Sequence, residues 1–278
     1  MIQEIFIDGY RSLRDIVIPL EPGLNILVGP NGGGKTNILS FVEFLSKLTE
    51  MNVDEAVSSH GGIGRVFRRR EENQYDTSFN AKVSGKIVFK TRGGYKRNLF
   101  YSWQFKISSS FDYDEIQYSS QRLFINLDTR PKRTADYDLI LATRRNDQFT
   151  QLKIERLVIS RLQHFFKGSY PIDASEYFTK DKALRFFEYS SRIQDLSKTS
   201  LPVIFSPQLI LIRRIVADVS NREIFNIVPE VCKQAEDTSQ PPVIEKNGPA
   251  LRVCSSTSRN PRPCVIEAVG VGTIHNPT

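Results

Sequence analysis

The fold of this chain follows from the stretch Gly29-Pro30-Asn31-Gly32-Gly33-Gly34-Lys35-Thr36. This stretch matches the pattern G-x-x-x-x-G-K-[ST], whose glycines let the backbone curl so that successive N–H groups point at phosphate oxygens. A helix that starts directly after such a loop presents its positive N-terminal end to the same phosphates. Because glycine makes up roughly 7% of residues in proteins, a chance match in such a chain is expected on the order of once in a hundred. The stretch therefore predicts a loop that binds the phosphates of ATP or GTP.

Individual residues of this phosphate loop have separate expected roles. Lys35 is expected to reach the β- and γ-phosphates as a point charge, and Thr36 is expected to place its hydroxyl on a Mg²⁺ ion. The full predicted set of loop contacts to the nucleotide is Asn31, Gly32, Gly33, Gly34, Lys35, Thr36 and Asn37. The predicted cofactors are ATP and Mg²⁺. ATP is favoured over GTP because the sequence lacks the guanine-specific N-K-x-D tetrad.

The residues on either side of the loop have the patterns that a phosphate loop needs. Leu24 to Val28 is a short apolar run that ends in a glycine, which is typical of a central buried strand. After the loop, apolar residues recur at helical spacing, at Ile38, Phe41, Leu45 and Leu48. The predicted order is therefore strand, glycine-rich loop and helix, which is the context expected for this motif.

Alternating apolar residues predict further strands. Ile5 and Ile7 recur at alternate positions, and so do Ile16, Ile18 and Leu20, as in half-buried strands. Residues 77–127 alternate again, with Gly93-Gly94 as a hairpin turn, which predicts an antiparallel sheet. The intervening residues 50–75 look irregular, because three glycines break any helical pattern there.

The chain is expected to have three parts. Residues 1–130 form a phosphate-loop core with an antiparallel sheet lobe, and residues 131–228 form a mostly helical segment. Residues 229–278 form an atypical tail, because seven of the 14 prolines and all three cysteines lie there while the last aromatic residue is Phe225. Two explanations of the tail are open: the end of a short protein that works with another subunit, or the remnant of a truncated gene. The missing aromatics favour the second.

Charge leaves room for an anionic partner. The net charge is +7, and four arginines follow the glycine-rich turn closely: Arg65, Arg68, Arg69 and Arg70. One interpretation is a solvated charge run that Glu71 and Glu72 partly neutralise. The other is a contact with the phosphate backbone of DNA.

Other classes are disfavoured. With 40% hydrophobic and 25% charged residues, a packed core is expected and global disorder is not. The sequence has no run of 18 apolar residues and no signal-like start, so we expect no membrane association and a cytoplasmic location. The cysteines are too few and wrongly spaced for a zinc site, and the histidines lie far apart.

Hydrolysis usually also needs a carboxylate at the end of an apolar strand, which helps to hold Mg²⁺ and to position water. The nearest candidate is Asp128, at the end of Leu123-Phe124-Ile125-Asn126-Leu127, although Asn126 interrupts the apolar run. A second apolar run, Leu209 to Ile212, leads into Arg213 instead of a carboxylate. The catalytic residue is therefore left open apart from Asp128.

With these residues in hand, the chain resembles the N-terminal part of an ABC-type ATPase head, as found in the RecF-, SMC- and OLD-like bacterial ATPases of the AAA family. Gly9-Tyr10-Arg11-Ser12-Leu13 is similar to their N-F-[RK]-S element. Residues 25–37 are similar to their N-x-h-x-G-x-N-G-x-G-K-[ST]-N loop, where h is apolar. Two further elements resemble a glycine pair after the first helix and a late G-x-x-L element: Gly61-Gly62, and Phe225–Pro229 together with Asn247–Leu251.

The resemblance implies an α/β fold of the P-loop NTPase type: the N-terminal lobe of an ABC-type head with a flanking antiparallel sheet and a mostly helical segment after it. It implies that Arg11 and Ser12 help to line the nucleotide, and that two heads sandwich ATP. The signature helix of the L-S-x-G type is not found, because Leu196-Ser197 continues into Lys198-Thr199. The resemblance therefore implies half of a catalytic head, with the signature motif supplied by a second copy or by a partner subunit.

Three functions remain open on these grounds. The first is an ATPase that acts with a partner in DNA repair or in defence against phage. The second is a nucleotide-binding regulatory subunit without turnover. The third is a truncated fragment that lacks the signature motif and the acidic strand.

Overall fold

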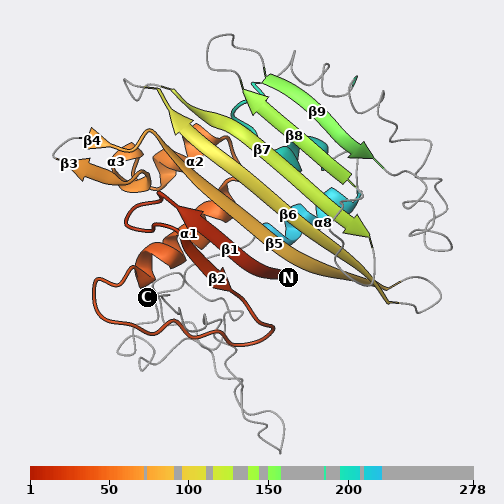
Figure 1. Cartoon of the computed structure of the whole chain (residues 1–278), viewed down its shortest axis with the longest axis horizontal. Helices are drawn as coiled ribbons and strands as arrows, with labels where there is room; N and C mark the ends of the chain where they lie inside the picture. The colour runs from red at the N-terminus through yellow and green to blue at the C-terminus, as the bar shows by residue number, and fades with distance from the viewer. Residues whose placement is uncertain are drawn as a thin grey trace, which may run out of the picture.

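Alternation of apolar and polar residues builds a sheet at the centre of the structure, and helices lie behind it in Figure 1. The computed structural model describes residues 1–71, 74–90, 96–110, 115–127, 137–143, 150–157, 185, 195–206 and 210–220. The described strands are β1 (Ile2–Asp8), β2 (Ile16–Pro19), β3 (Arg69–Glu71), β4 (Gln74–Tyr75), β5 (Ser78–Lys90), β6 (Lys96–Ser109), β7 (Ile116–Leu127), β8 (Tyr137–Thr143) and β9 (Thr150–Leu157). The described helices are α1 (Lys35–Lys47), α2 (Val53–Ser59), α3 (Ile63–Val66), α7 (Leu201–Phe205) and α8 (Ile210–Val219).

The main sheet is antiparallel at every described pairing and has the strand order β2-β1-β5-β6-β7-β8-β9, while β3 and β4 form a separate two-stranded ribbon. Strands β5 and β6 pair from Ser78 opposite Ser108 to Lys90 opposite Lys96, which confirms the predicted hairpin. Its predicted turn, Gly93-Gly94, lies outside the described residues. The predicted strands at the N-terminus are confirmed as β1 and β2.

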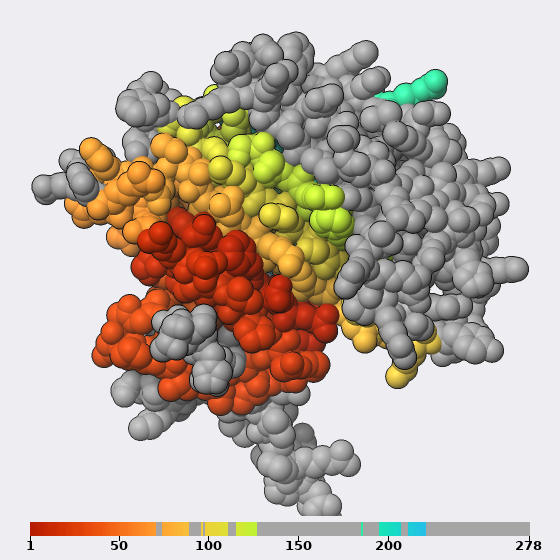
Figure 2. Space-filling view, viewed as in Figure 1, coloured from red at the N-terminus to blue at the C-terminus, as the bar shows by residue number. Residues whose placement is uncertain are grey.

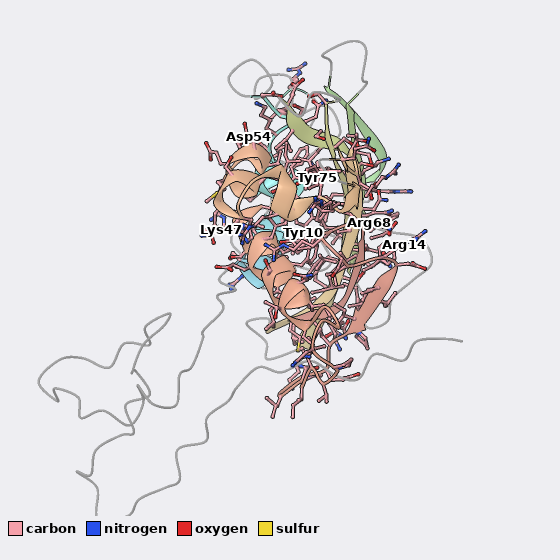
Figure 3. All side chains as sticks on the ribbon, turned by 90° about the vertical axis from the view of Figure 1, so that its left-hand side faces the viewer. Tyr10, Arg14, Lys47, Asp54, Arg68 and Tyr75 are labelled. Atoms are coloured by element: carbon pink, nitrogen blue, oxygen red, sulfur yellow. The ribbon has the colours of Figure 1, made fainter. Side chains whose placement is uncertain are left out.

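The core lies between one face of the sheet and the helices. In the edge-on view of Figure 3, α1 and α2 lie on one side of the sheet. The opposite face is turned toward the viewer in Figure 2, where β1 and β5 lie side by side at the surface. Along the three long strands β5, β6 and β7, buried side chains alternate with more exposed ones. The buried ones are Phe79, Ala81, Val83, Leu99, Tyr101, Trp103, Phe105, Ile107, Leu123 and Ile125. Burying each large apolar side chain stabilises the fold by roughly 1.5–3 kcal/mol, so this layer fixes the sheet against the helices.

Helix α1 begins and packs where the apolar period predicts. The four predicted core residues, Ile38, Phe41, Leu45 and Leu48, are all at most 1% exposed. Tyr10 is also buried and meets Phe41 in a T-shaped contact, with 5.0 Å between ring centroids. This contact joins the turn after β1 to the helix that follows the phosphate loop.

A buried polar cluster anchors α7 to the sheet. The side chain of Gln121 on β7 is 1% exposed, and its Oε1 accepts hydrogen bonds from Trp103 Nε1 at 3.3 Å and from the Leu201 N–H at 2.7 Å. Its Nε2 donates to the carbonyl oxygen of Thr199 at 2.9 Å. The amide therefore satisfies the backbone at the start of α7, which is one reason why this helix stays on β7.

The prediction of a buried strand at Leu24–Val28 is wrong for the described structure. These residues form no strand, and Leu24, Ile26 and Val28 are 60%, 58% and 76% exposed. Strand pattern alone cannot bury a segment, because burial needs a neighbouring strand, and no described strand pairs with this one. Asn25 is buried instead and bonds the Glu21 N–H through Oδ1 at 2.8 Å.

The expectation of irregular structure at residues 50–75 is also wrong. Helices α2 and α3 lie on either side of Gly61-Gly62, and the ribbon of β3 and β4 follows them. Val53, Ala56 and Val57 are fully buried, so core packing stabilises α2 in spite of its short length. The glycines serve as the break between two helices, since both have positive φ.

The segment predicted to be mostly helical begins with strands. Strand β8 pairs with β7, and β9 pairs with β8, so the helical prediction is wrong for residues 137–143 and 150–157. The cause is long-range, because the open edge of β7 offers backbone hydrogen bonds that a local pattern does not reveal. Helices α7 and α8 agree with the prediction, and Pro202 occupies the first turn of α7, where proline is tolerated. The tail at 229–278 lies outside the described residues.

Candidate phosphate-binding site

The phosphate loop leads directly into α1 through a residue that needs to be glycine. Gly34 is the N-cap of α1 and has φ 84° and ψ 1°, in the left-handed region. A Cβ at this position would lie 3.2 Å from Leu13 Cδ2, so any other residue would meet both strain and crowding. The glycine of the G-K-[ST] pattern therefore allows the tight entry into the helix.

Lys35 lies over the loop itself. Its Nζ donates hydrogen bonds to the carbonyl oxygens of Gly29 and Pro30, both at 2.7 Å. The Gly33 N–H donates to the Pro30 carbonyl oxygen at 3.1 Å, which closes a turn inside the loop. The ammonium is thus held close to the loop backbone by acceptors that phosphate oxygens, which carry more negative charge, can replace.

The start of α1 suits an anion. No side chain caps its N-terminus, and its first turn contains no acidic residue. The first N–H groups of a helix have no partner within the helix and carry the positive end of its dipole. Thr36 is exposed in this first turn, so its hydroxyl is available to hold a magnesium ion that accompanies a nucleotide.

The turn after β1 lies beside this helix start. Asn37 Nδ2 donates to Ser12 Oγ at 2.7 Å, and Arg11 Nη1 donates to Asn37 Oδ1 at 3.4 Å. The structure thus places Arg11 and Ser12 next to Asn37, although they precede it by 26 and 25 residues. All three belong to the residues expected to contact the nucleotide.

The backbone of this turn is held in an unusual conformation. Arg11 has φ 49°, which residues other than glycine rarely adopt. Its N–H donates to the Val66 carbonyl oxygen at 2.9 Å, and its Nε donates to the Arg65 carbonyl oxygen at 2.6 Å. Such conformations persist only where surrounding contacts hold them, and they are concentrated at functional sites.

Tyr10 supports the turn from below. Burial raises the pKa of its phenol, and a hydrogen bond with Ser40 Oγ at 3.2 Å offsets part of that effect. The phenol is neutral at physiological pH, so its role is structural: it ties the turn to α1.

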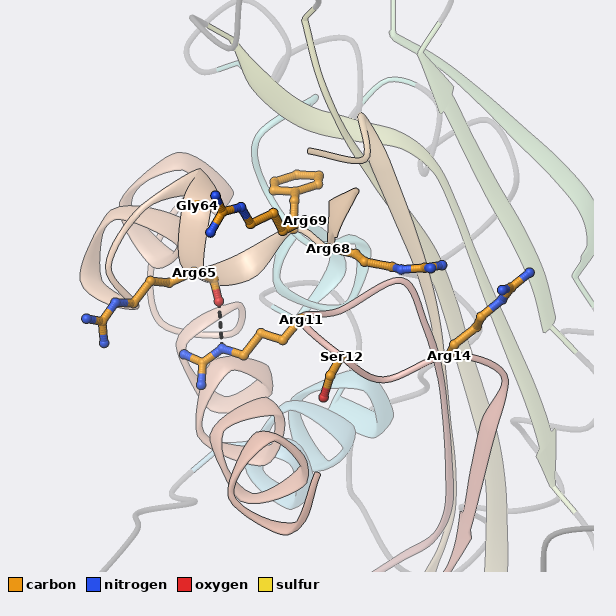
Figure 4. Close-up of a pocket in the computed structure, with 8 residues that line it drawn as sticks. Arg11, Ser12, Arg14, Gly64, Arg65, Arg68 and Arg69 are labelled. Atoms are coloured by element: carbon orange, nitrogen blue, oxygen red, sulfur yellow. Dashed lines mark hydrogen bonds between the residues drawn. The ribbon is translucent and has the colours of Figure 1, made fainter. Parts of the chain in front are cut away.

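An arginine-lined pocket of about 550 Å³ adjoins the turn (Figure 4). Three arginines of the predicted cluster line it, namely Arg65, Arg68 and Arg69. Arg70 does not line it, and its side chain pairs with Asp76. The other lining residues are Arg11, Ser12, Arg14, Gly64 and Phe67.

The pocket therefore corrects the sequence-based cluster in two ways. Arg14 is a member that sequence reasoning missed, and Arg70 is a predicted member that points to an ion pair instead. The signal for Arg14 was weak but present, since it follows the Tyr10–Leu13 element by one residue.

The sequence left the catalytic carboxylate and the signature motif open. Asp128 lies outside the described residues. Leu196 and Ser197 are 2% and 4% exposed, and Ser197 donates its hydroxyl and its N–H to Asp195 Oδ1. This segment is therefore part of the packed core and is not an exposed signature element.

The described residues contain no group of three or more His, Cys, Asp or Glu side chains that could hold a metal ion. None of the described helices is long and apolar enough to cross a membrane.

A family model described as AAA ATPase domain matches residues 1–215 of the chain. Curated relatives match shorter stretches. The DNA replication and repair protein RecF of Beutenbergia cavernae is 35% identical over 71 residues, which are 25% of this chain and 18% of that protein. The protein of the same name from Bifidobacterium adolescentis is 53% identical over 45 residues, covering 16% of this chain and 11% of that protein.

Structural maintenance of chromosomes protein 3 of Dictyostelium discoideum is 44% identical over 55 residues, covering 19% of this chain and 4% of that protein. A solved structure described as "Structural biochemistry of ATP-driven dimerization and DNA stimulated activation of SMC ATPases" is 14% identical, with a TM-score of 0.26, covering 70% of this chain and 99% of that chain. The matches to these three curated relatives span at most 18% of their length.

Proposed function

Because the chain belongs to the AAA ATPase domain family, we propose that it binds Mg-ATP as one half of an ATPase whose active site is completed by a second protein body. It is the N-terminal part of an ABC-type head with a P-loop NTPase fold. The observation that carries the proposal is the loop Gly29–Thr36, with Lys35 held over its carbonyl oxygens at the uncapped start of α1. These are the charges and donors that a triphosphate requires.

The phosphate loop, the start of α1 and the turn after β1 together form the half-site that this chain contributes, and each of their residues has a part in the proposal. Lys35 moves from the loop carbonyls to the β- and γ-phosphates, and the first N–H groups of α1 bind phosphate oxygens. Thr36 holds Mg²⁺, which when bound neutralises charge on the phosphates. Arg11 and Ser12 stand at the side of the nucleotide, where their contacts with Asn37 fix them.

We infer that a second body completes catalysis. Binding ground-state ATP does not by itself speed hydrolysis, because only groups that favour the transition state do so. Those groups are a carboxylate that orients water and a signature helix that faces the nucleotide. For the carboxylate this chain offers Asp128, which follows an interrupted apolar run. The nearest sequence to a signature motif, Leu196-Ser197, is buried. A second copy of the chain or a partner subunit would supply them.

The names of the relatives support a role on DNA. Two of them are DNA replication and repair proteins, and one is a protein of chromosome structure maintenance. We propose a role in DNA repair or in defence against phage. A regulatory subunit that binds nucleotide without turnover is the alternative.

The test of nucleotide binding is the Lys35→Ala variant. Removing one charge-assisted contact is expected to weaken Mg-ATP binding by about 2 kcal/mol or more, which is roughly thirtyfold. Labelled Mg-ATP titration of both proteins, with their melting temperatures as a control for folding, measures the difference. If the folded variant binds Mg-ATP with wild-type affinity, the phosphate loop is not the nucleotide-binding site.

A further inference from the structure

We propose that the arginine-lined pocket beside α3 binds backbone phosphates of a nucleic-acid strand, at a site separate from the phosphate loop. The proposal deepens the DNA-linked part of the proposed function and rests on it. It does not require that the chain hydrolyse ATP, so the two can fail separately.

The pocket is assembled from segments that are far apart in the sequence. The turn after β1 contributes Arg11 and Arg14, and α3 contributes Arg65. Arg68 directly precedes β3, and Arg69 is its first residue. A backbone bridge between Tyr10 and Phe67 holds the turn and this segment together. Folding therefore concentrates these arginines around one hollow of about 550 Å³.

The lining carries positive charge without acidic side chains. Five of its eight residues are arginines, and none is Asp or Glu. Arg70, which pairs with Asp76, does not line the pocket. Like charges gathered around one hollow repel each other, and a bound polyanion relieves that repulsion. The planar guanidinium fork matches phosphate oxygens in geometry, so phosphate is the anion that this lining fits.

The arrangement fits a chain of phosphates better than a single one. Figure 4 shows Arg14 and Arg68 extending to one side of the pocket, while Arg11 and Arg65 extend to the other. Arg14, Arg65 and Arg69 are exposed, so a long ligand can pass over them without entering a closed cavity.

The lining also lacks what a nucleotide base needs. Its one aromatic residue, Phe67, is 1% exposed, so it offers no face on which a base could stack. Recognition through phosphate alone is independent of base sequence. The net charge of +7 on the whole chain suits the same partner.

The pocket is distinct from the phosphate loop but borders it. None of the residues Gly29–Thr36 lines it. Arg11 and Ser12 do line it, and both bond Asn37 in the first turn of α1, so these two residues are shared with the nucleotide site. Variants at Arg14 and Arg68 therefore change the pocket and leave the residues that contact Asn37 in place.

The test compares Arg14→Gln/Arg68→Gln with Arg70→Gln, using the full chain and a fluorescent duplex of random sequence in a salt series. The double variant is expected to bind DNA about a hundredfold more weakly, at roughly tenfold for each lost charged contact. Its salt slope should fall by about two units, since each phosphate contact contributes about one. Arg70→Gln, whose arginine pairs with Asp76, should stay within about twofold of wild type.

Three controls keep the result decisive. Unchanged melting temperatures exclude unfolding, and Arg14→Gln alone should give about half of the effect in the logarithm of affinity. Unchanged Mg-ATP affinity in the double variant, and unchanged DNA affinity in Lys35→Ala, would separate the pocket from the phosphate loop. A second duplex of different sequence should give the same loss.

Two outcomes overturn the proposal. One is a double variant that binds DNA with wild-type affinity and salt slope. The other comes from a competition experiment with the Lys35→Ala variant, in which inorganic triphosphate and unlabelled DNA each displace the fluorescent duplex. If triphosphate does so at a lower total phosphate concentration than unlabelled DNA, the pocket binds a free polyphosphate instead.

Discussion

His60, at the end of α2, makes the stability of this region depend on pH. Its ring meets Phe44 edge-on, with 5.1 Å between centroids, and its Nδ1 lies 3.1 Å from the Ala56 carbonyl oxygen. Nε2 is buried without a hydrogen-bond partner in the described structure. Burial therefore lowers the pKa of His60, while the Ala56 contact and Glu43 partly offset this effect and Arg11 and Lys47 add to it.

The sign of the pH dependence follows from that lowered pKa. The unfolded chain takes up the proton near pH 6.5 and the folded chain only at lower pH, so the free energy of unfolding falls as pH drops below about 6.5. We predict that His60→Phe, which keeps a ring against Phe44, loses this part of the slope, which is at most about 1.4 kcal/mol per pH unit. Urea unfolding of both proteins between about pH 7 and pH 5 measures it. Equal slopes in the two proteins would contradict the prediction.

At the scale of elements, Gln121 couples the sheet to α7. Its amide bonds Trp103, Thr199 and Leu201, and it is buried from water. Gln121→Leu keeps a similar volume but leaves those three polar groups unpaired. We expect the free energy of unfolding to fall by about 3 kcal/mol or more, at about 1 kcal/mol or more for each orphaned group.

The matched control for this change is Gln104→Leu. Gln104 lies on the neighbouring strand β6 but is exposed on the open face of the sheet. The same substitution there is expected to change stability by less than about 0.5 kcal/mol. Chemical denaturation of the two variants compares them directly. Equal losses would show that the polar cluster does not anchor α7.

At the scale of the whole molecule, the expected activity is binding without turnover. The half-site holds the groups that grip ground-state ATP, while a transition state also needs an oriented water and an opposing signature helix. We predict that the purified chain binds Mg-ATP and releases phosphate near background. Addition of the cognate second body is expected to raise release, with Lys35→Ala abolishing the gain.

Phosphate release by the isolated chain, with Lys35→Ala as control, is the measurement that decides this prediction. Rapid Lys35-dependent release by a monomer would mean that this chain carries its own catalytic carboxylate. Asp128 would then be the first residue to substitute, as Asp128→Asn.

Local chemistry was sufficient to predict the glycine turn into α1, the helix α1 itself and the paired strands from β5 to β7. Glycine conformations, a helical apolar period and strand alternation each act within a few residues, so they can be read along the chain. The AAA ATPase domain match over residues 1–215 agrees with the family resemblance that those motifs carry.

The arginine-lined pocket, the turn beside α1 and the outer strands of the sheet depend instead on contacts between residues that are distant in the sequence. Arg14 and Arg68 line the same pocket, and Ser12 bonds Asn37, because the fold brings these distant residues together. Strand β8 pairs with the edge of β7 in the same way. The same holds for Leu24–Val28, whose strand-like pattern ends up exposed because no described strand lies beside it. Burial and partnership depend on what the fold brings alongside a segment, and a local pattern carries no information about that neighbour.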